Sequence, residues 1–366
     1  MRIDAVDIWP LELPLEQPFV ISQETLQTAP SLMVRLQSGV HEGFGESGVS
    51  RRVLGEDLEQ AFRSAQQVRA ALLGATLPPG AWEEQRALIP SAAAATAFDM
   101  AAQDLWSRRF RTHFLPELQR QPRTVRSSFT ITVMAPAKVR GEGLLRWEQG
   151  WQVFKLKIGN DPRADIARLA ALRGALPLAT IRVDANGGLD AKSFGQLRPA
   201  LEEFGVELLE QPFPTTAVDL YAQAHEGPIP VFLDEGVATA RDVEAAARHK
   251  SCAGVNLKLE KARGLFPLIE AIEVATRNNL QIMLGCFITT RVSLSALASV
   301  VEAFPAIDRV DLDGPYLLGT DPIAGGTTIA HGVLGPSLAG PGHGAVPMPS
   351  RLLRWDRKAP PAPTMP

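Results

Sequence analysis

The sequence predicts a (β/α)7β barrel of the TIM type with an N-terminal α+β capping domain. Strand-like runs alternate with helix-like segments from Ser127 onward, which is typical of a parallel sheet. Charged side chains close five successive apolar runs, with gaps of 27, 26, 24 and 24 residues between them. These are Lys157, Asp184, Glu210, Asp234 and Lys258. The first part of the chain instead shows strands followed by helices, which indicates an α+β unit.

The capping domain is expected over residues 1–122 and the barrel over residues 123–320. In the cap we expect two strands, a turn region and two helices, at residues 3–13, 31–37, 39–48, 57–73 and 91–110. In the barrel we expect eight strands, at residues 128–133, 153–158, 180–184, 206–210, 231–234, 254–257, 281–284 and 309–312, separated by helices such as 164–172 and 265–277. Residues 321–366 are expected to return to the cap and to end flexibly in KAPPAPTMP.

Composition narrows the class of partner. The 366 residues include 37 basic and 40 acidic ones, so a net charge of -3 offers no electrostatic reason to expect nucleic acid or an anionic membrane. The start, MRIDAVDIWPLELPL, lacks the basic end of a signal peptide, and no apolar run of about 18 residues occurs. We therefore expect a cytoplasmic protein that acts on a small molecule, as a homo-oligomer. With only Cys252 and Cys286, a disulfide framework or a cysteine-based zinc site is not expected.

The strand ends carry the predicted chemistry, because the C-terminal ends of barrel strands meet at the mouth where active sites are built. Asp184, Glu210 and Asp234 end three consecutive strands, so their oxygens can converge. An all-oxygen set without histidine or cysteine favours Mg²⁺, with Mn²⁺ as the alternative. Taken singly, each aspartate could instead be a helix N-cap.

Two lysines flank these carboxylates. Lys157 and Lys258 end strands two and six, which barrel closure puts on opposite sides of the mouth. Lys155 shares a face with Lys157, and Asn256 shares a face with Lys258, because side chains two apart on a strand point the same way. We expect the like charge of Lys155 to disfavour protonation of Lys157. One amine could then remove a proton from a carbon next to a carboxylate while the other returns a proton to the opposite face. A solvated lysine pair at a strand end is the simpler interpretation of K-x-K alone.

Five motifs and one helix match a known family. The segments FKLKIG, RVDANGG, LLEQPF, FLDEG and NLKLEK, with the helix FDMAAQDL, resemble the enolase superfamily in its muconate-lactonizing branch, over essentially the whole chain. The resemblance implies that the three carboxylates bind the metal, that Lys157 and Lys258 are the acid/base pair, and that Lys155 helps to neutralise a substrate carboxylate.

The sequence of the predicted eighth strand indicates which enzyme of this branch the chain resembles. VDLDGP places Asp311 and Asp313 on one inward face, where two anions suit an ammonium group. This D-x-D, together with Thr130 in SSFTITV, resembles the dipeptide epimerases, such as the alanyl-glutamate epimerases. The resemblance implies Mg²⁺-dependent 1,1-proton transfer, through an enediolate, at the Cα of the C-terminal residue of an L,L-dipeptide.

The cap modifies the expected specificity. In alanyl-glutamate epimerases a cap loop carries an arginine that reads the acidic side chain, whereas the equivalent stretch here, FVISQETLQ, has no basic residue and contains Glu24. We therefore expect a hydrophobic or cationic side chain on the substrate. Two alternatives stay open: an o-succinylbenzoate synthase or N-acylamino acid racemase, which would not use the D-x-D, and a non-catalytic metal-binding barrel.

Overall fold

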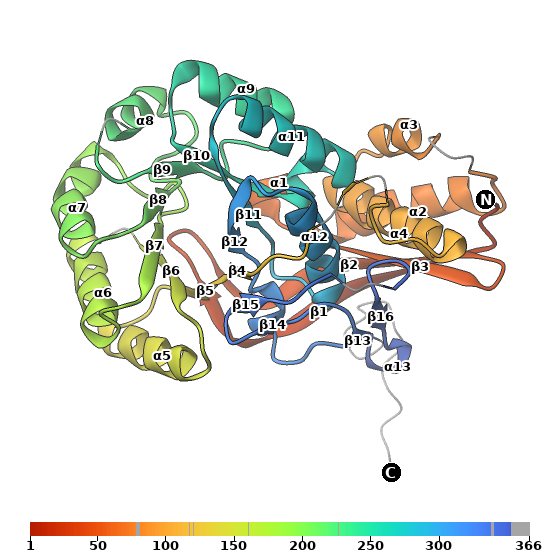
Figure 1. Cartoon of the computed structure of the whole chain (residues 1–366), viewed down its shortest axis with the longest axis horizontal. Helices are drawn as coiled ribbons and strands as arrows, with labels where there is room; N and C mark the ends of the chain where they lie inside the picture. The colour runs from red at the N-terminus through yellow and green to blue at the C-terminus, as the bar shows by residue number, and fades with distance from the viewer. Residues whose placement is uncertain are drawn as a thin grey trace, which may run out of the picture.

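The computed structural model describes residues 1–77, 81–116, 118–119, 121–159, 161–225, 227–337 and 340–352. A cap of antiparallel sheet and helices lies beside a barrel of parallel strands ringed by helices (Figure 1). This confirms the predicted fold class. The stretch KAPPAPTMP, for which a flexible end was expected, lies outside the described residues. In the part of the chain that is described, no helix has the length and apolar character needed to cross a bilayer.

The cap has one three-stranded antiparallel sheet covered by helices. Its strands are β1 (Ala5–Val20), β2 (Thr25–Ser38) and β3 (His41–Gly48), in that order across the sheet. Its helices are α1 (Arg51–Leu54), α2 (Leu58–Leu72), α3 (Ala81–Ala87) and α4 (Ala92–Phe110). Helix α2 begins with a capping box in which Asp57 and Gln60 bond each other's backbone amides, in line with the helical pattern predicted from residue 57.

Strand β3 corrects the sequence prediction, which had a turn region over residues 39–48. The glycines in this stretch are needed for packing rather than for turning, because the alanine-rich helix α4 lies directly against the strand. A Cβ atom on Gly43 would lie 2.3 Å from the carbonyl oxygen of Ala101, and one on Gly45 would lie 2.0 Å from that of Ala97. Glycine therefore lets strand and helix backbones approach closely here.

The barrel contains all eight predicted strands, and they run parallel in chain order. They are β5 (Ser128–Ile131), β6 (Val153–Lys157), β7 (Thr180–Asp184), β8 (Leu208–Glu210), β9 (Val231–Leu233), β10 (Gly254–Lys258), β11 (Gln281–Gly285) and β12 (Ile307–Asp311). A parallel bridge between Ser127 and Val310 brings the first strand beside the last, which closes the barrel. The intervening helices are α5 (Pro136–Glu148), α6 (Pro162–Ala175), α7 (Ala191–Glu203), α8 (Val218–His225), α9 (Ala240–His249), α10 (Leu259–Ala262), α11 (Leu265–Arg277) and α12 (Arg291–Ala303).

Short elements join the two parts. Strand β4 (Val125–Arg126) pairs with β15 (Val333–Leu334), which pairs with β14 (Ile329–Ala330), while β13 (Ile323–Gly325) pairs with β16 (Ala345–Pro347), and α13 (Pro349–Leu352) follows. Here the described part of the tail contacts the cap: the amide of Gly342 donates to the carbonyl of Thr112 over 3.1 Å. His343 lies buried with its Nε2 atom 2.8 Å from the carbonyl of Phe44.

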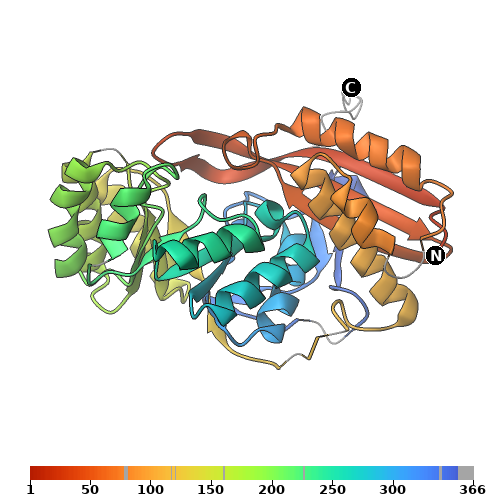
Figure 2. The same cartoon turned by 90° about the horizontal axis from the view of Figure 1, so that it is seen from above.

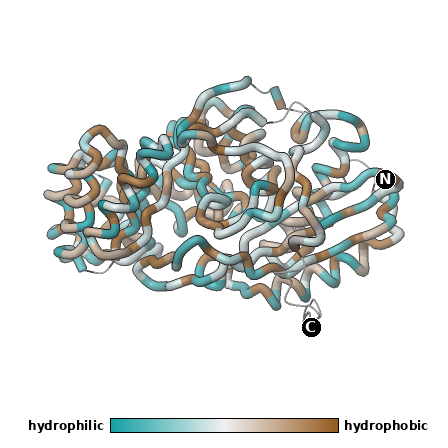
Figure 3. The backbone as a smooth tube through the Cα atoms, turned by 90° about the horizontal axis from the view of Figure 1, so that it is seen from below, coloured by the Kyte–Doolittle hydropathy of each residue, from teal (hydrophilic) through white to brown (hydrophobic). Residues whose placement is uncertain are grey.

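The hairpin of β1 and β2 reaches away from the cap and over the barrel (Figure 2). It is held there by backbone hydrogen bonds, including Val133 N–H to Val20 O and Glu16 N–H to Leu317 O, both of 2.9 Å. Hydrophobic and hydrophilic positions are interspersed along the cap and the outer helices (Figure 3). The cap therefore covers the end of the barrel where the charged strand ends lie.

Candidate active site

A cavity of about 310 Å³ lies between the cap and the barrel mouth. The cap contributes Phe19, Glu24 and Arg52 to its wall, and the barrel contributes charged side chains from strand ends. Among these barrel side chains are Lys155, Lys157, Lys258, Asp311 and Asp313, together with Thr130. The cap side of the cavity thus mixes apolar and charged groups and the barrel side is strongly charged, which suits a small charged molecule.

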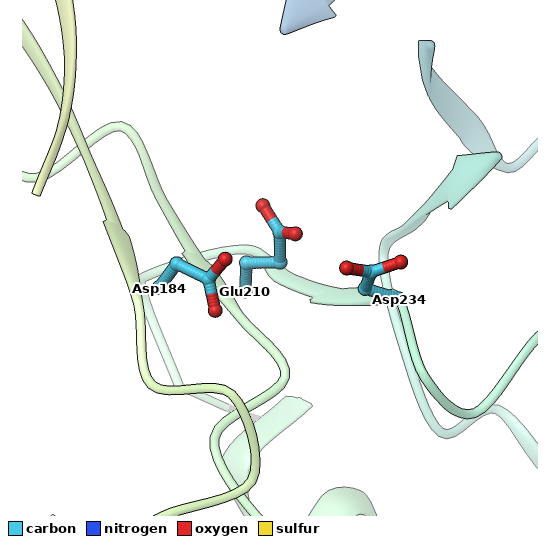
Figure 4. Close-up of side chains that lie close together, drawn as sticks. All are labelled: Asp184, Glu210 and Asp234. Atoms are coloured by element: carbon cyan, nitrogen blue, oxygen red, sulfur yellow. The ribbon is translucent and has the colours of Figure 1, made fainter. Parts of the chain in front are cut away.

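Three carboxylates converge at the mouth of the barrel. Asp184 and Glu210 are the last residues of β7 and β8, and Asp234 directly follows β9. Each side chain offers an oxygen, and these three oxygens lie within 4.8 Å of one another. Figure 4 shows Glu210 between the two aspartates, with the carboxylates facing a common space. All three residues are buried.

The three carboxylates differ in the direction in which their pKa values are shifted. Burial raises the pKa of Asp184, but the charges of Lys155 and Lys157 outweigh it and hold that pKa below its ordinary value. Burial likewise acts on Asp234, and Lys258 together with Lys261 brings its pKa well below the usual range. For Glu210, burial and the charge of Asp184 dominate and raise the pKa to about 8. Three buried carboxylates at this separation repel one another, so the cluster is suited to a small dication.

The two lysines flank the trio from opposite sides. In the strand order, three strands separate β6 from β10 in either direction around the closed barrel. The Nζ atom of Lys157 lies 2.6 Å from Oδ2 of Asp184, and that of Lys258 lies 2.7 Å from Oδ2 of Asp234. Lys157 and Lys258 are therefore paired with different carboxylates.

An aromatic ring lies near each of these amines. The ring of Phe19, from the cap hairpin, is centred 5.9 Å from Nζ of Lys157. The ring of Phe287, from the loop after β11, is centred 5.8 Å from Nζ of Lys258. Such rings exclude water and attract a cation.

Lys155 lies among carboxylates. Its Nζ atom is 3.0 Å from Asp184, 2.8 Å from Glu210 and 2.8 Å from Asp311. Burial lowers the pKa of Lys155, but these carboxylates outweigh burial and raise it well above the ordinary value. Its positive charge is thus compensated locally, while its expected effect on the protonation of Lys157 stays a prediction. The interaction with a substrate carboxylate stays a prediction.

The remaining predicted residues surround this centre. Asp311 accepts from the hydroxyl of Ser128 over 2.6 Å, and Asp313 accepts from the backbone amide of Thr130 over 2.6 Å. Burial and the charge of Asp311 raise the pKa of Asp313 to about 7. Asn256 donates to Oε1 of Glu210 over 2.9 Å, so this amide orients the central carboxylate.

Glu24 lies at the tip of the cap hairpin, half-buried in the cavity wall. Among the described residues, no ion pair is found for its carboxylate. Glu24 is thus one of the charged residues in the cap side of the cavity wall.

Sequence reasoning missed several residues at the site. Asn186 accepts from Lys157 over 3.1 Å, and Lys261 lies 2.6 Å from Oδ1 of Asp234. Both stand close in sequence to a predicted residue, in DAN and KLEK, and that proximity was the available signal. Arg52 and Glu235 form an ion pair of 2.6 Å between cap and barrel, for which the sequence holds no local signal.

Comparison with known proteins decides the family. The family model described as "Enolase C-terminal domain-like" matches residues 141–350. The protein belongs to the enolase superfamily. This superfamily member is 32% identical over 337 residues to the L-Ala-D/L-amino acid epimerase of Flavobacterium johnsoniae, covering 88% of this chain and 94% of the relative.

Two further relatives agree. The hydrophobic dipeptide epimerase of Roseobacter litoralis is 31% identical over 334 residues, which cover 90% of this chain and 95% of that one. A solved structure of a dipeptide epimerase from Methylococcus capsulatus, complexed with Mg and the dipeptide L-Arg-D-Lys, superposes with a TM-score of 0.87. It is 29% identical and the match covers 94% of this chain and 100% of that chain.

Proposed function

We propose that this protein is a Mg²⁺-dependent dipeptide epimerase, an isomerase that inverts the Cα of the C-terminal residue of an L,L-dipeptide. The observation that carries the proposal is the placement of Lys157 and Lys258 on opposite sides of one carboxylate trio, each paired with a different member. Inversion needs a proton removed on one face of a carbon and returned on the other. Two amines facing a common centre provide both operations.

The carboxylate trio fits Mg²⁺. Asp184, Glu210 and Asp234 are all-oxygen ligands within 4.8 Å of one another, and burial with mutual repulsion raises the pKa of Glu210 to about 8. When bound, Mg²⁺ supplies the positive charge that stabilises negative charge building up on a substrate carboxylate. We assign Lys155, which already contacts the trio, to the same carboxylate.

The lysines perform the proton transfer. One amine, in its neutral form, accepts the Cα proton, and the electron pair of the broken C–H bond moves toward the carboxylate to give an enediolate. The other amine, in its ammonium form, then donates a proton to the opposite face of the carbon. Lys157 and Lys258 exchange these roles for the reverse direction, so one site epimerises both isomers.

The D-x-D pair selects dipeptides. We assign Asp311 and Asp313 to the free α-ammonium group of the substrate, with Thr130 holding Asp313 through its backbone amide. Asn256 keeps the central carboxylate oriented. Glu24 in the cavity wall supports a substrate with a hydrophobic or cationic side chain and opposes an acidic one.

The test is a dipeptide library incubated with the enzyme in D₂O with Mg²⁺. Mass gain of one deuterium at Cα for free dipeptides, with no gain for N-succinyl or N-acyl amino acids, supports the proposal. The reverse pattern would assign the protein to the N-acylamino acid racemases. Tight binding without any exchange would identify a metal-binding barrel that does not catalyse.

We further propose that the enzyme is a cytoplasmic homo-oligomer with a capping domain at 1–122, a barrel at 123–320 and a returning tail at 321–366. Light scattering after size-exclusion chromatography measures the oligomeric state. Cell fractionation tests the location, and limited proteolysis with mass spectrometry tests the boundaries.

A further inference from the structure

Two separate segments of the cap meet one turn of the barrel, directly after strand β7. From the hairpin tip, the hydroxyl of Ser22 donates to the carbonyl of Ala185 over 3.3 Å, and the amide of Gln23 donates to the carbonyl of Asn186 over 3.2 Å. Asn186 has a φ of 47°, in the left-handed region that non-glycine residues rarely adopt. Backbone of this kind persists where surrounding contacts hold it, and the cap supplies such contacts.

The second cap segment reaches the same turn through side chains. Arg52, on α1, forms an ion pair of 2.6 Å with Oε1 of Glu235. The amide nitrogen of Asn186 donates to the same oxygen over 3.2 Å. Nζ of Lys157 donates to the amide oxygen of Asn186 over 3.1 Å. We call Arg52, Glu235, Asn186 and Lys157 the Arg52 relay. It connects the cap to the amine of Lys157.

The relay fixes which way the Asn186 amide points. An amide has a donor end and an acceptor end, and here the donor end faces a carboxylate while the acceptor end faces an amine. Turning the amide over would set its NH₂ group against Lys157 and its oxygen against Glu235, and both contacts would be repulsive. Glu235 therefore orients Asn186, and Arg52 in turn holds Glu235.

Lys258, on the opposite side of the barrel mouth, is held by other contacts. Lys258 contacts Asp234 and the ring of Phe287, and Asp234 also accepts from Lys261. Asp234 and Lys261 belong to the barrel, and the ring of Phe287, also from the barrel, packs against Gly48 of the cap. By contrast, Lys157 lies near the ring of Phe19, which belongs to the cap, and it is reached by the relay that starts at Arg52 in the cap.

We propose that Asn186 is a positioning residue for Lys157 and that the docked cap, through Arg52 and Glu235, keeps it in place. The inference rests on the proposed function, in which Lys157 serves one face of the substrate carbon. Cap docking then prepares the proton transfer on that face, while the ion pair that holds Lys258 is formed within the barrel. Loss of the relay therefore lowers deuterium exchange more for the isomer that Lys157 deprotonates than for the other isomer.

The experiment compares deuterium exchange of the two isomers of one dipeptide. The probe is the library dipeptide that exchanges fastest with the wild-type enzyme, supplied separately as its L,L and L,D forms. Lys258→Ala identifies the isomer served by Lys157, as the one whose exchange it retains. Arg52→Ala is expected to lower the exchange of that isomer by about 10-fold to 100-fold, the range for a misplaced catalytic group, and that of the other isomer much less. Arg52→Lys, which keeps the cation, is expected to restore part of the loss.

Arg263→Ala is the matched control. Arg263 also links the barrel to the cap, because it donates to the cap carbonyls of Ile89 and Pro90, but it lies between α10 and α11 and is not part of the relay. It is expected to lower Tm and to leave the ratio between the two isomers unchanged. If Arg52→Ala does not fold, Asn186→Gly takes its place, because glycine tolerates the positive φ at this position. It is expected to change the exchange of the two isomers in the same way.

Equal effects of Arg52→Ala and Asn186→Gly on both isomers would overturn the inference, because a merely structural contact lowers both exchanges together. Wild-type exchange rates for both isomers in the two variants would overturn it as well. If the wild-type enzyme exchanges no dipeptide at all, the proposed function itself fails, which is a different result from an enzyme that exchanges both isomers independently of Arg52.

Discussion

Lys258 and Asp234 form an ion pair, with 2.7 Å between Nζ and Oδ2, at the ends of the neighbouring strands β10 and β9. Lys157 makes the corresponding pair with Asp184 on the other side of the mouth. Because the two amines do not share a carboxylate, either one can be removed without unpairing the other.

Lys258→Ala is therefore expected to abolish epimerisation but to leave deuterium exchange for one isomer. The remaining amine still removes and returns a proton on its own face. NMR of each isomer in D₂O measures this. Lys192→Ala, which removes an exposed lysine from α7, is expected to behave like the wild type. Equal loss of exchange for both isomers would contradict separate roles for the two lysines.

Mg²⁺ is expected to stabilise the protein against heat in the absence of substrate. Binding to the native state alone contributes about 2.7 kcal/mol at a free ion concentration 100 times Kd. Glu210→Gln keeps the shape of the central ligand but removes its charge, and so is expected to lose most of the Tm increase. Glu202→Gln, a surface change in α7, is expected to retain it. An undiminished increase in the Glu210 variant would show that the ion binds elsewhere.

Substrate affinity is expected to fall as pH falls through about 7. Burial and the charge of Asp311 raise the pKa of Asp313 to about 7, so below that pH Asp313 is protonated and must lose a proton before it can bind an ammonium group. The substrate's own amino group, with a pKa near 8, stays charged in this range. KM measured from pH 5.5 to 8 is thus expected to rise on the acidic side.

Asp313→Asn tests the origin of that dependence. The variant is expected to raise KM at pH 8 and to lose the increase below pH 7, because no proton is then exchanged at this position. Asp308→Asn, an exposed change on β12, is expected to keep the wild-type profile. The assignment to Asp313 would be wrong if the acidic increase survived in its asparagine variant.

Glu24→Gln is expected to lower kcat/KM for dipeptides with cationic side chains by up to about fivefold, the range for a partly exposed ion pair of about 1 kcal/mol. Dipeptides with aliphatic side chains are expected to change little. Competition between one dipeptide of each kind in the same reaction gives the ratio directly. An unaltered ratio would exclude Glu24 from side-chain recognition.

Gly45→Ala is expected to destabilise the cap by about 3 kcal/mol, because the added Cβ would lie 2.0 Å from the carbonyl oxygen of Ala97 and neither backbone can yield easily. Gly141→Ala provides the control. Position 141 lies inside α5 with no heavy atom within 4 Å of the added Cβ, so the change is expected to stabilise by about 0.5–1 kcal/mol. Denaturant unfolding of both variants gives the two values, and equal stability would refute the packing argument.

The sequence alone determined the barrel, its eight strands and the edge at which the charged side chains gather. Those features have local causes. Apolar runs alternate with amphipathic segments at an almost constant interval, and a residue that ends a parallel strand lies at the barrel mouth whatever its neighbours are. The segment 39–48 shows the limit of local reasoning. Its glycines are typical of a turn when the sequence is read alone. They are needed instead for close packing against helix α4, which lies about 50 residues later in the chain.

Only the tertiary structure decided which charges meet. Lys155 lies among Asp184, Glu210 and Asp311, and Arg52 reaches Glu235 across 183 positions of sequence. No periodicity records such a pairing, because it depends on how the cap and the barrel pack together and on which carboxylate lies nearest once water is excluded. Sequence pattern sets the direction in which a side chain points, whereas its partner is set by contacts between segments that the chain keeps far apart.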